Sequence, residues 1–259
     1  MARNVEKRFD VRQILPSAKS VISLGVNYYA PFKHSPKENA GKVSRYAWGK
    51  DYHFIMWDET EKLIAKLTEK FPSLEAKAYV DTGPVMDKAW AVRSGIGWLG
   101  KNGNVINRKI GSWFFIATVI TNLEIESSFP APDLCGTCSA CIDACPTNAI
   151  IADSVIDANR CISYLTIENK NNISDEFKGK FENWIFGCDI CQEVCPWNKK
   201  FSTPSSIKEF EPIVAKEIEF ADIFELTNSK FKKRFGESPI NRARLKGMKR
   251  NAEFLKTEM

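Results

Sequence analysis

Cysteine is the residue type that most clearly indicates chemistry in this 259-residue chain. All eight cysteines lie between positions 135 and 195, and seven of them form two spaced runs. The first run has the spacing C-x2-C-x2-C-x3-C-P, and the second repeats it without the first cysteine. This spacing is typical of loops that bind 4Fe-4S clusters. The sequence therefore predicts two such clusters, and Cys161 is the cysteine left to complete the second.

The spacing also predicts which cysteines share a cluster. Three cysteines on one short loop can bind three corners of a cubane, but the same tight loop cannot reach the fourth corner. The cysteine before proline is therefore expected to bind the other cluster. One ligand set would be Cys135, Cys138, Cys141 and Cys195, and the other would be Cys161, Cys188, Cys191 and Cys145.

Disulfides and zinc are the alternative uses of so many thiols. Disulfide-dense domains are usually short and secreted, whereas the charged residues 1–8 are followed by no apolar segment of a signal peptide. Zinc sites favour paired C-x2-C units, often with histidine, but this chain has only two histidines and both of its runs end in C-x3-C-P. Both alternatives are disfavoured.

Length and composition favour a globular protein with one large domain and a smaller appended module. The chain is 44% hydrophobic and 27% charged, as in ordinary soluble proteins. Its longest apolar stretch, residues 113–120, is too short to cross a bilayer. We therefore expect a cytoplasmic protein with no membrane partner and with reduced thiols.

The residues before the cysteines alternate between strand and helix patterns. Strands are predicted at 20–27, 77–80 and 113–123. A capping box at Asp58–Glu61 predicts that a helix begins there, and a short helix is predicted at 87–94. These elements predict an α+β domain built of α/β layers over residues 1–130. A cluster module would follow at 131–200, and a basic helical region at 201–259.

The last region is strongly basic. Between positions 228 and 250, nine basic residues accompany one acid, Glu237. Most charge runs are solvated helix faces, but this ratio and the net charge of +5 favour a polyanionic partner. RNA, DNA and an anionic membrane stay open on this pattern alone. The residues are Lys230, Lys232, Lys233, Arg234, Arg242, Arg244, Lys246, Lys249 and Arg250.

Residues 80–106 carry a second set of candidate residues. Asp81 lies in an Asp-Thr-Gly-Pro turn, where aspartate is more often a turn former than an acid. The segment 95–100 has the spacing G-x-G-x-x-G, but no acidic residue follows at the distance that a dinucleotide site needs. A nicotinamide cofactor is therefore not predicted.

Four segments, taken with the doubled cluster motif, resemble the epoxyqueuosine reductase family. They are residues 44–53, 80–106, 160–168 and 187–198. The resemblance extends over nearly the whole chain. It implies a cobalamin-dependent enzyme with two 4Fe-4S clusters that removes the epoxide oxygen from epoxyqueuosine in the wobble position of tRNA and gives queuosine. It also implies a low-potential electron donor such as ferredoxin or flavodoxin.

The resemblance further implies a fold and a set of site residues. The catalytic domain would be a nitroreductase-like cobalamin-binding domain, as in reductive dehalogenases, followed by a ferredoxin-like two-cluster module and the basic C-terminus. Asp81 would be the proton donor and would also contact the cofactor, and Asp189 would bring one cluster and the corrin together. The other implied corrin contacts are Ser44, Arg45, Tyr46, Lys101, Asn102, Asn104, Val105 and Ser163. The implied tRNA contacts are Lys230, Lys232, Lys233, Arg234, Arg242 and Arg244.

The reaction explains why such a site needs an acid. Converting an epoxide to an alkene consumes two electrons, and the oxygen leaves as water only if it is protonated. A carboxyl group that donates a proton near neutral pH needs a raised pKa. We expect burial beneath the corrin and the substrate to raise the pKa of Asp81.

Two features depart from related patterns. The cobalamin signature D-x-H-x-x-G is absent, since Asp51-Tyr-His53 is followed by no glycine, and the resemblance implies base-off binding without a histidine ligand. Residues 1–10 resemble a segment that family members carry several tens of residues into their chains. The family's first helices are therefore expected to be missing here, or the start to be misassigned.

Two other functions compete with this interpretation. A plain electron carrier needs only the cluster module and would be much shorter. A reductive dehalogenase shares the cofactors, but it usually carries a twin-arginine export signal, and a small halogenated substrate would leave the basic region unexplained.

Overall fold

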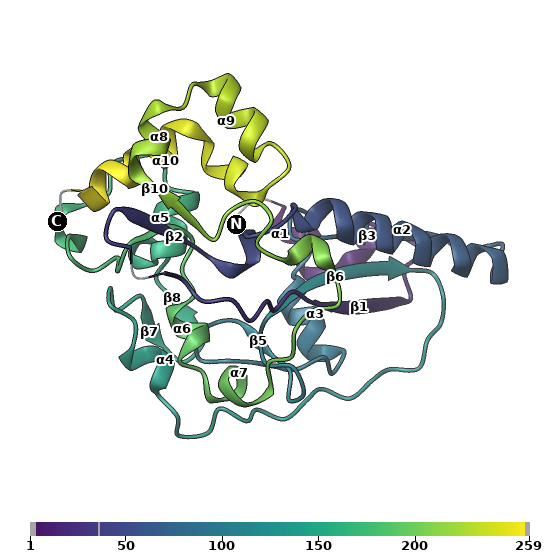
Figure 1. Cartoon of the computed structure of the whole chain (residues 1–259). Helices are drawn as coiled ribbons and strands as arrows, with labels where there is room; N and C mark the ends of the chain where they lie inside the picture. The colour runs from purple at the N-terminus through teal and green to yellow at the C-terminus, as the bar shows by residue number, and fades with distance from the viewer. Residues whose placement is uncertain (1–3, 36, 257–259) are drawn as a thin grey trace.

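The computed structural model describes residues 4–35 and 37–256, and it has a mixed α and β fold. One sheet is antiparallel with the strand order β1–β6–β3 (Figure 1). These strands are Ser20–Asn27, Phe114–Thr121 and Ala76–Tyr79, respectively. They confirm the three strands expected in the first half of the chain to within two residues at each end.

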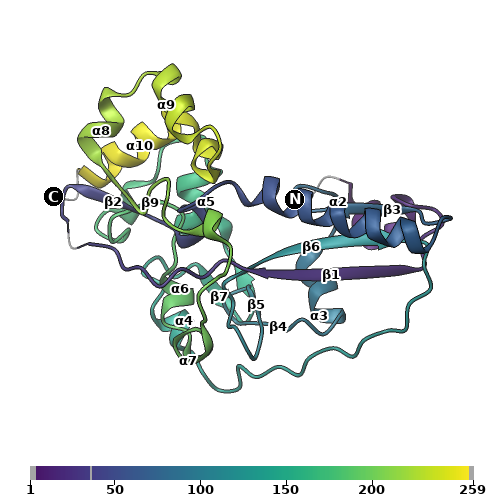
Figure 2. The same ribbon diagram turned by 45° about the vertical axis from the view of Figure 1, so that its right-hand side comes forward.

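Two helices cover opposite faces of this sheet (Figure 2). Along β6, Phe115 packs with Met56 of one helix, whereas its neighbour Phe114 packs with Ala91 of the other. Successive side chains of a strand point to opposite faces, so the continuous apolar run of β6 is buried on both sides. The helices are α2, Tyr52–Lys70, and α3, Asp87–Arg93.

Helix α2 begins earlier than the sequence predicts. Its N-cap is Asp51, whose side chain accepts a hydrogen bond from the backbone N–H of His53. The expected capping box at Asp58 is therefore wrong, since Asp58 lies inside the helix and pairs with Lys62 one turn later. Asp51 and Asp58 are both of a residue type that commonly caps a helix. The tertiary packing of residues 52–57 decides that the helix begins after Asp51.

A second sheet joins distant parts of the chain. Strand β2 pairs antiparallel with β10 and parallel with β9. The core around it contains Trp48, Trp184, Phe235 and Leu255. Residues from all three predicted domain segments therefore contribute to one core, and Ile190 of the second cysteine run is among them. The strands are β2, Ala40–Val43, β9, Trp184–Phe186, and β10, Glu217–Glu219. The helices around them are α5, Ile162–Ile167, α8, Phe220–Glu225, α9, Asn228–Phe235, and α10, Arg244–Lys256.

The cysteine loops carry very short elements. Helix α4 contacts α6, and α7 follows α6 directly (Figure 1). Two hairpins lie beside them: β4–β5 and β7–β8. The helices are α4, Ala140–Asp143, α6, Ile190–Glu193, and α7, Pro196–Phe201. The strands are β4, Trp98–Leu99, β5, Val105–Ile106, β7, Ile150–Ala152, and β8, Val155–Ile156.

The remaining elements are short. Helix α1 is Val5–Phe9. The 3-10 helices are Val11–Gln13, Arg45–Ala47, Ala158–Arg160, Asp175–Phe177, Lys208–Phe210 and Pro239–Ala243. In the described part of the chain, no helix combines the length and apolar character that crossing a membrane requires.

Candidate active site and cluster-binding sites

The first predicted ligand set lines a single cavity of about 380 Å³. Trp98 donates a hydrogen bond from Nε1 to the Cys135 sulfur at 3.4 Å. Trp197 packs against Trp98 with ring centroids 5.0 Å apart. Three of the cysteines come from the first run and one from the second, as the crossed arrangement expects. They are Cys135, Cys138, Cys141 and Cys195. Four free thiols around one cavity fit a cubane.

The second predicted set is partly buried: Cys145, Cys161, Cys188 and Cys191 all have intermediate exposure. Burial raises the pKa of the Cys191 thiol, and the nearby charge of Cys161 raises it further. Burial also raises the pKa of Cys188, with smaller contributions from Cys191 and Cys161. Cys161 therefore lies near the two cysteines that begin the second run. Cys141 and Cys145 both lie near Cys191 as well, and the assignment of Cys145 to this set stays a prediction.

Neither group resembles a site for one metal ion. Within residues 4–35 and 37–256, no three side chains of His, Cys, Asp or Glu are arranged to hold a single ion. The cysteine ligands of a cubane bind different iron atoms at its corners, so their sulfurs lie farther apart than the ligands of one ion.

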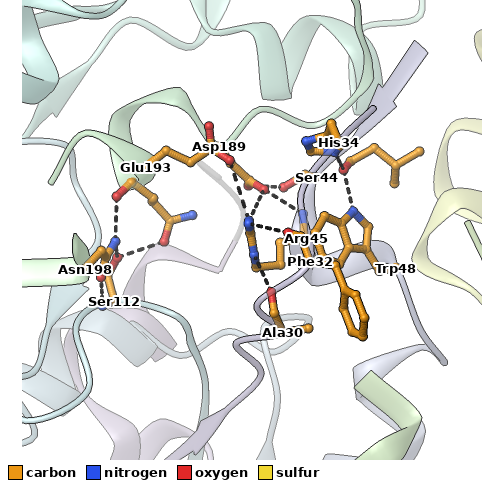
Figure 3. Close-up of polar contacts among 12 residues, drawn as sticks. Ala30, Phe32, His34, Ser44, Arg45, Trp48, Ser112, Asp189, Glu193 and Asn198 are labelled. Atoms are coloured by element: carbon orange, nitrogen blue, oxygen red, sulfur yellow. Dashed lines mark hydrogen bonds and ion pairs between the residues drawn. The ribbon is translucent and has the colours of Figure 1, made fainter. Parts of the chain in front are cut away.

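A buried ion pair attaches the second cysteine run to β2 and the helix that follows it. Asp189 is fully buried and accepts hydrogen bonds from the Ser44 hydroxyl and, at 2.7 Å, from the Arg45 backbone N–H. The Arg45 guanidinium lies 3.7 Å from Asp189 and donates to the carbonyls of Ala30 and Phe32 (Figure 3). Burial raises the pKa of Asp189 to about 6, and Arg45 opposes that rise. These residues are enclosed by protein.

Close packing at Gly187 supports the same attachment. Gly187 precedes Cys188 and has a φ of 69°, a conformation that favours glycine. A Cβ atom there would lie 2.5 Å from Cβ of Ser44. The neighbouring Tyr46 packs with its ring centroid 6.1 Å from Phe186 and 6.2 Å from Tyr52. The predicted corrin residues 44–46 therefore lie between the two sheets, and Tyr46 extends toward the Asp81 side.

Asp81 is exposed and lies in the turn after β3. Its φ of 58° is unusual for a residue other than glycine, and such backbone conformations often occur at functional sites. The Tyr52 hydroxyl donates a hydrogen bond to Asp81 Oδ2 at 2.9 Å. Burial and the Asp81 charge raise the pKa of Tyr52, so that hydroxyl stays protonated and acts as a donor.

Lys88 links Asp81 to the buried cysteines. Burial lowers the pKa of its ammonium group, while the charges of Asp81, Cys191 and Cys161 oppose that shift. The side chain is nevertheless exposed to solvent. Lys88 therefore lies near both Asp81 and the second cysteine set.

The loop between β4 and β5 contacts Lys88. Lys88 Nζ donates to the Gly103 carbonyl at 2.7 Å and lies 3.4 Å from the Asn104 side-chain oxygen. Asn102 is buried and donates to the Cys191 carbonyl at 3.3 Å. Val105 is buried in the core, whereas Lys101 lines the first cavity.

Comparisons with known proteins agree with this arrangement. A model of the 4Fe-4S double cluster binding domain matches residues 134–198, and a model described as Epoxyqueuosine reductase QueG, DUF1730 matches residues 8–82. Epoxyqueuosine reductase from Leadbetterella byssophila is 49% identical over 99% of this chain and 83% of its own length. The Synechocystis sp. enzyme is 42% identical over 95% of this chain and 86% of its own length. This chain belongs to the epoxyqueuosine reductase family.

Solved family structures have the same fold. The Streptococcus thermophilus epoxyqueuosine reductase superposes with a TM-score of 0.90 at 36% identity, over 99% of this chain and 69% of that one. A crystal structure of epoxyqueuosine reductase with an epoxyqueuosine-modified tRNA-Tyr stem loop gives 0.93 at 34% identity, with the same coverage. The resemblance inferred from the sequence is confirmed, and this family member is an oxidoreductase with a 4Fe-4S double cluster domain.

The basic residues of this family member divide into paired and unpaired groups. Arg234 pairs with Asp222 at 3.2 Å, and Arg250 donates to backbone carbonyls, including that of Leu165 at 2.8 Å. Arg250 is therefore a structural residue. Four predicted tRNA contacts are exposed and form no side-chain ion pair within the described residues: Lys230, Lys232, Lys233 and Arg244. They lie on α9 and at the start of α10.

Arg242 lies near Asp81. It pairs with Glu168 at 2.8 Å. This contact raises the pKa of the Arg242 guanidinium, and the charges of Asp81 and Tyr52 add to the effect. Of the other predicted site residues, Ser163 is half-buried on α5. Its role in binding a cofactor stays a prediction.

Sequence reasoning misses Tyr52 and Lys88. In the sequence, Tyr52 stands out only as part of an incomplete cobalamin signature. Because the helix is expected to begin at Asp58, the sequence offers no reason to place Tyr52 beside Asp81. Lys88 falls in the first turn of the predicted helix 87–94, where a lysine is ordinarily solvated. The closeness of Lys88 to the Asp-Thr-Gly-Pro turn in the sequence is the signal that could have identified this residue.

Proposed function

We propose that this protein reduces epoxyqueuosine to queuosine at the wobble position of tRNA, with cobalamin and two 4Fe-4S clusters as cofactors. The observation that carries the proposal is the position of Lys88 near both Asp81 and two cysteines of the second set, Cys161 and Cys191. It brings a proton donor next to an electron supply. The reaction needs both, because it consumes two electrons and two protons and releases one water.

Cobalamin would bind beside Asp81 and Lys88, in a nitroreductase-like domain. The groups there are the Lys88 ammonium, the Asn104 side-chain amide and the Tyr52 hydroxyl. Such groups can hydrogen-bond to the amide side chains at the edge of a corrin. Bound cobalamin would supply a low-potential cobalt centre for reduction of the epoxide carbon.

Asp81 would protonate the departing oxygen. The Tyr52 hydroxyl donates to one carboxyl oxygen of Asp81, which leaves the other oxygen free to face the substrate. A Bacillus subtilis epoxyqueuosine reductase, 32% identical, has been solved with a catalytic aspartate loop swung out of the active site. Asp81 lies in an exposed turn, so an aspartate loop that moves in a relative supports this role.

The exposed basic residues of α9 and α10 would bind the tRNA backbone. Phosphates are recognised mainly by lysine and arginine, and such contacts position a nucleic acid without reading its sequence. Arg242 lies closest to the reaction, because its charge interacts with Asp81. The family structure with a tRNA stem loop supports a tRNA substrate here.

The test is a single-turnover assay under anaerobic conditions. Protein reconstituted with iron, sulfide and cobalamin would be mixed with titanium(III) citrate and a tRNA anticodon stem loop that carries epoxyqueuosine. Mass spectrometry of the digested nucleosides should detect queuosine, about 16 mass units lighter than the substrate because one oxygen is lost. Omission of cobalamin is the control. No queuosine from protein with full iron and cobalamin content would refute the proposal.

A further inference from the structure

The indole of Trp98 contacts a cysteine of the first set directly. Its Nε1 N–H donates to the Cys135 sulfur at 3.4 Å, and the side chain is only 2% exposed, so protein shields this bond from water. Within residues 4–35 and 37–256, the other N–H groups that donate to a cysteine sulfur belong to the backbone. The N–H of Ala149, 3.3 Å from the Cys145 sulfur, is an example. Trp98 is therefore a donor that a substitution can remove.

Close packing holds the Trp98 ring in place. Trp98 lies on β4 opposite Ile106 of β5. It packs with Ile106 and Cys195 in one buried cluster, and Trp197 lies edge-on to it, with an interplanar angle of 73°. A Cβ atom at Gly97 would lie 2.1 Å from the Ile106 carbonyl oxygen, so the hairpin needs a glycine beside the tryptophan. The β4–β5 hairpin thus fixes the direction of the Trp98 N–H.

The same hairpin contacts the second cysteine set in a different way. Asn102 donates to the Cys191 backbone carbonyl at 3.3 Å. A donor to a backbone carbonyl positions the loop, whereas a donor to a ligand sulfur changes the electrostatic environment of a cluster. The Trp98 bond is therefore the contact of this hairpin that can affect the redox chemistry of a cluster.

A donor to a ligand sulfur stabilises the two oxidation states of a cluster unequally. Cysteine binds metal as a thiolate, and hydrogen bonds to ionised groups are stronger than those to neutral groups. Reduction adds one electron and so increases the negative charge shared by the iron and sulfur atoms. The N–H therefore stabilises the reduced cluster more than the oxidised one. No proton is transferred, because the hydrogen stays on the indole nitrogen in both states.

We propose that Trp98 raises the reduction potential of the first cluster through its hydrogen bond to the Cys135 sulfur. Hydrogen bonds to sulfur are among the factors that set cluster potentials. This inference rests on the proposed function for the presence of a cubane in the first cavity. It adds a residue that determines how readily that cubane accepts an electron.

The experiment is a redox titration of reconstituted protein with sodium dithionite, followed by EPR, without tRNA or cobalamin. Trp98→Phe keeps an aromatic ring in the packed site and removes the N–H. The equilibrium constant for one-electron reduction of the first cluster should fall about tenfold, which lowers its potential by roughly 59 mV. The potential of the second cluster should not change. The cluster that shifts should be the one that Cys138→Ala lacks.

The matched control is Trp197→Phe. Trp197 lines the same cavity, but its Nε1 donates to the Leu134 carbonyl at 3.4 Å. Both cluster potentials should keep their wild-type values in this variant. An unchanged potential in Trp98→Phe would overturn the proposal. Equal shifts in the two variants would also overturn it, because lost packing or entry of solvent would then explain the change.

A measurement on the wild type covers the case in which Trp98→Phe binds no cluster. Protein whose tryptophans carry a heavy nitrogen isotope at Nε1 should show coupling between that nucleus and the reduced first cluster in pulsed EPR. Absence of this coupling would contradict the proposed bond. Neither measurement needs a substrate, so both can succeed in a protein that fails to reduce epoxyqueuosine. The two proposals are therefore tested separately.

Discussion

The two cysteine sets share a motif but occupy different environments. The first surrounds a cavity that opens at the surface, with Cys138 exposed. The second lies where burial strongly raises the thiol pKa of Cys188 and Cys191. The difference arises because the second run continues from β9 in the main core, whereas the first follows a long extended segment after β6 (Figure 1). Similar local spacing can thus place cysteines in different environments.

The ion pairs beside the two sets differ in the same way. Beside the second, Arg45 and Asp189 retain only 7% and 0% of their side-chain exposure. Beside the first, Lys101 pairs with Asp153 at 3.4 Å, and 67% of the Asp153 side chain is exposed. A buried pair leaves a costly unpaired charge when one partner is removed, whereas an exposed pair contributes little.

The largest expected effect tests how the ligands divide between the two sites. Cys195→Ala should remove the cluster of the first cavity and leave the second, because Cys195 lines the first cavity. Iron content should fall by about half, as expected for one of two cubanes. Its EPR spectrum should match that of Cys138→Ala, and the spectrum of Cys145→Ala should match that of Cys188→Ala. The opposite matching would show that the ligand sets are not crossed.

The next effect tests the contrast between the buried and exposed ion pairs. Arg45→Met should cost about 3 to 5 kcal/mol in the free energy of unfolding, or roughly 10 °C in melting temperature. Asp153→Asn should cost less than about 1 kcal/mol. Circular dichroism of the reconstituted proteins measures both. If Asp189 is left as an unpaired charge, Arg45→Met with Asp189→Asn should be more stable than Arg45→Met alone. Similar destabilisation at both pairs would contradict the contrast.

A third prediction tests whether Asp81 donates the proton in the reaction. Asp81→Asn should lower the rate of epoxyqueuosine reduction by about 100-fold or more, since the amide cannot donate the proton. Iron content, cobalamin binding and cluster reduction by flavodoxin should be unchanged. Asp58→Asn, on the exposed face of α2, is the matched control. A near-normal rate in Asp81→Asn would remove Asp81 from the mechanism.

The smallest effect tests the proposed tRNA surface, with two exposed lysines of α7 as the matched control. Charge reversal of Lys230, Lys232 and Lys233, which are exposed on α9, should weaken tRNA binding and flatten its salt dependence. The slope of log K against log salt should change by roughly 0.7 to 0.9 for each phosphate that a lysine no longer neutralises. Reversal of Lys199 and Lys200 should leave that slope unchanged. Equal slopes in both variants and the wild type would show that the α9 lysines are solvated surface residues that do not bind tRNA.

Local patterns in the sequence determine the cofactor class and several elements. Cysteine spacing acts over a few residues, so it identifies a 4Fe-4S double cluster domain without knowledge of the fold. The predicted bounds of strand β1, Ser20–Asn27, are the observed ones, because alternation and β-branched residues act locally too. Family membership follows from several such motifs together, and the comparisons confirm it.

Only the tertiary structure decided how distant residues meet. Arg45 and Asp189 are 144 positions apart, and Tyr52 and Asp81 are 29 apart, yet each pair is in contact. No local spacing encodes these contacts, because they depend on how β2, α2 and the cysteine loops pack around shared cores. The same packing exposes Cys138, buries Cys195 and leaves the other six cysteines partly buried. Sequence therefore determined which groups this protein carries, and the fold decided which of them face solvent, substrate or one another.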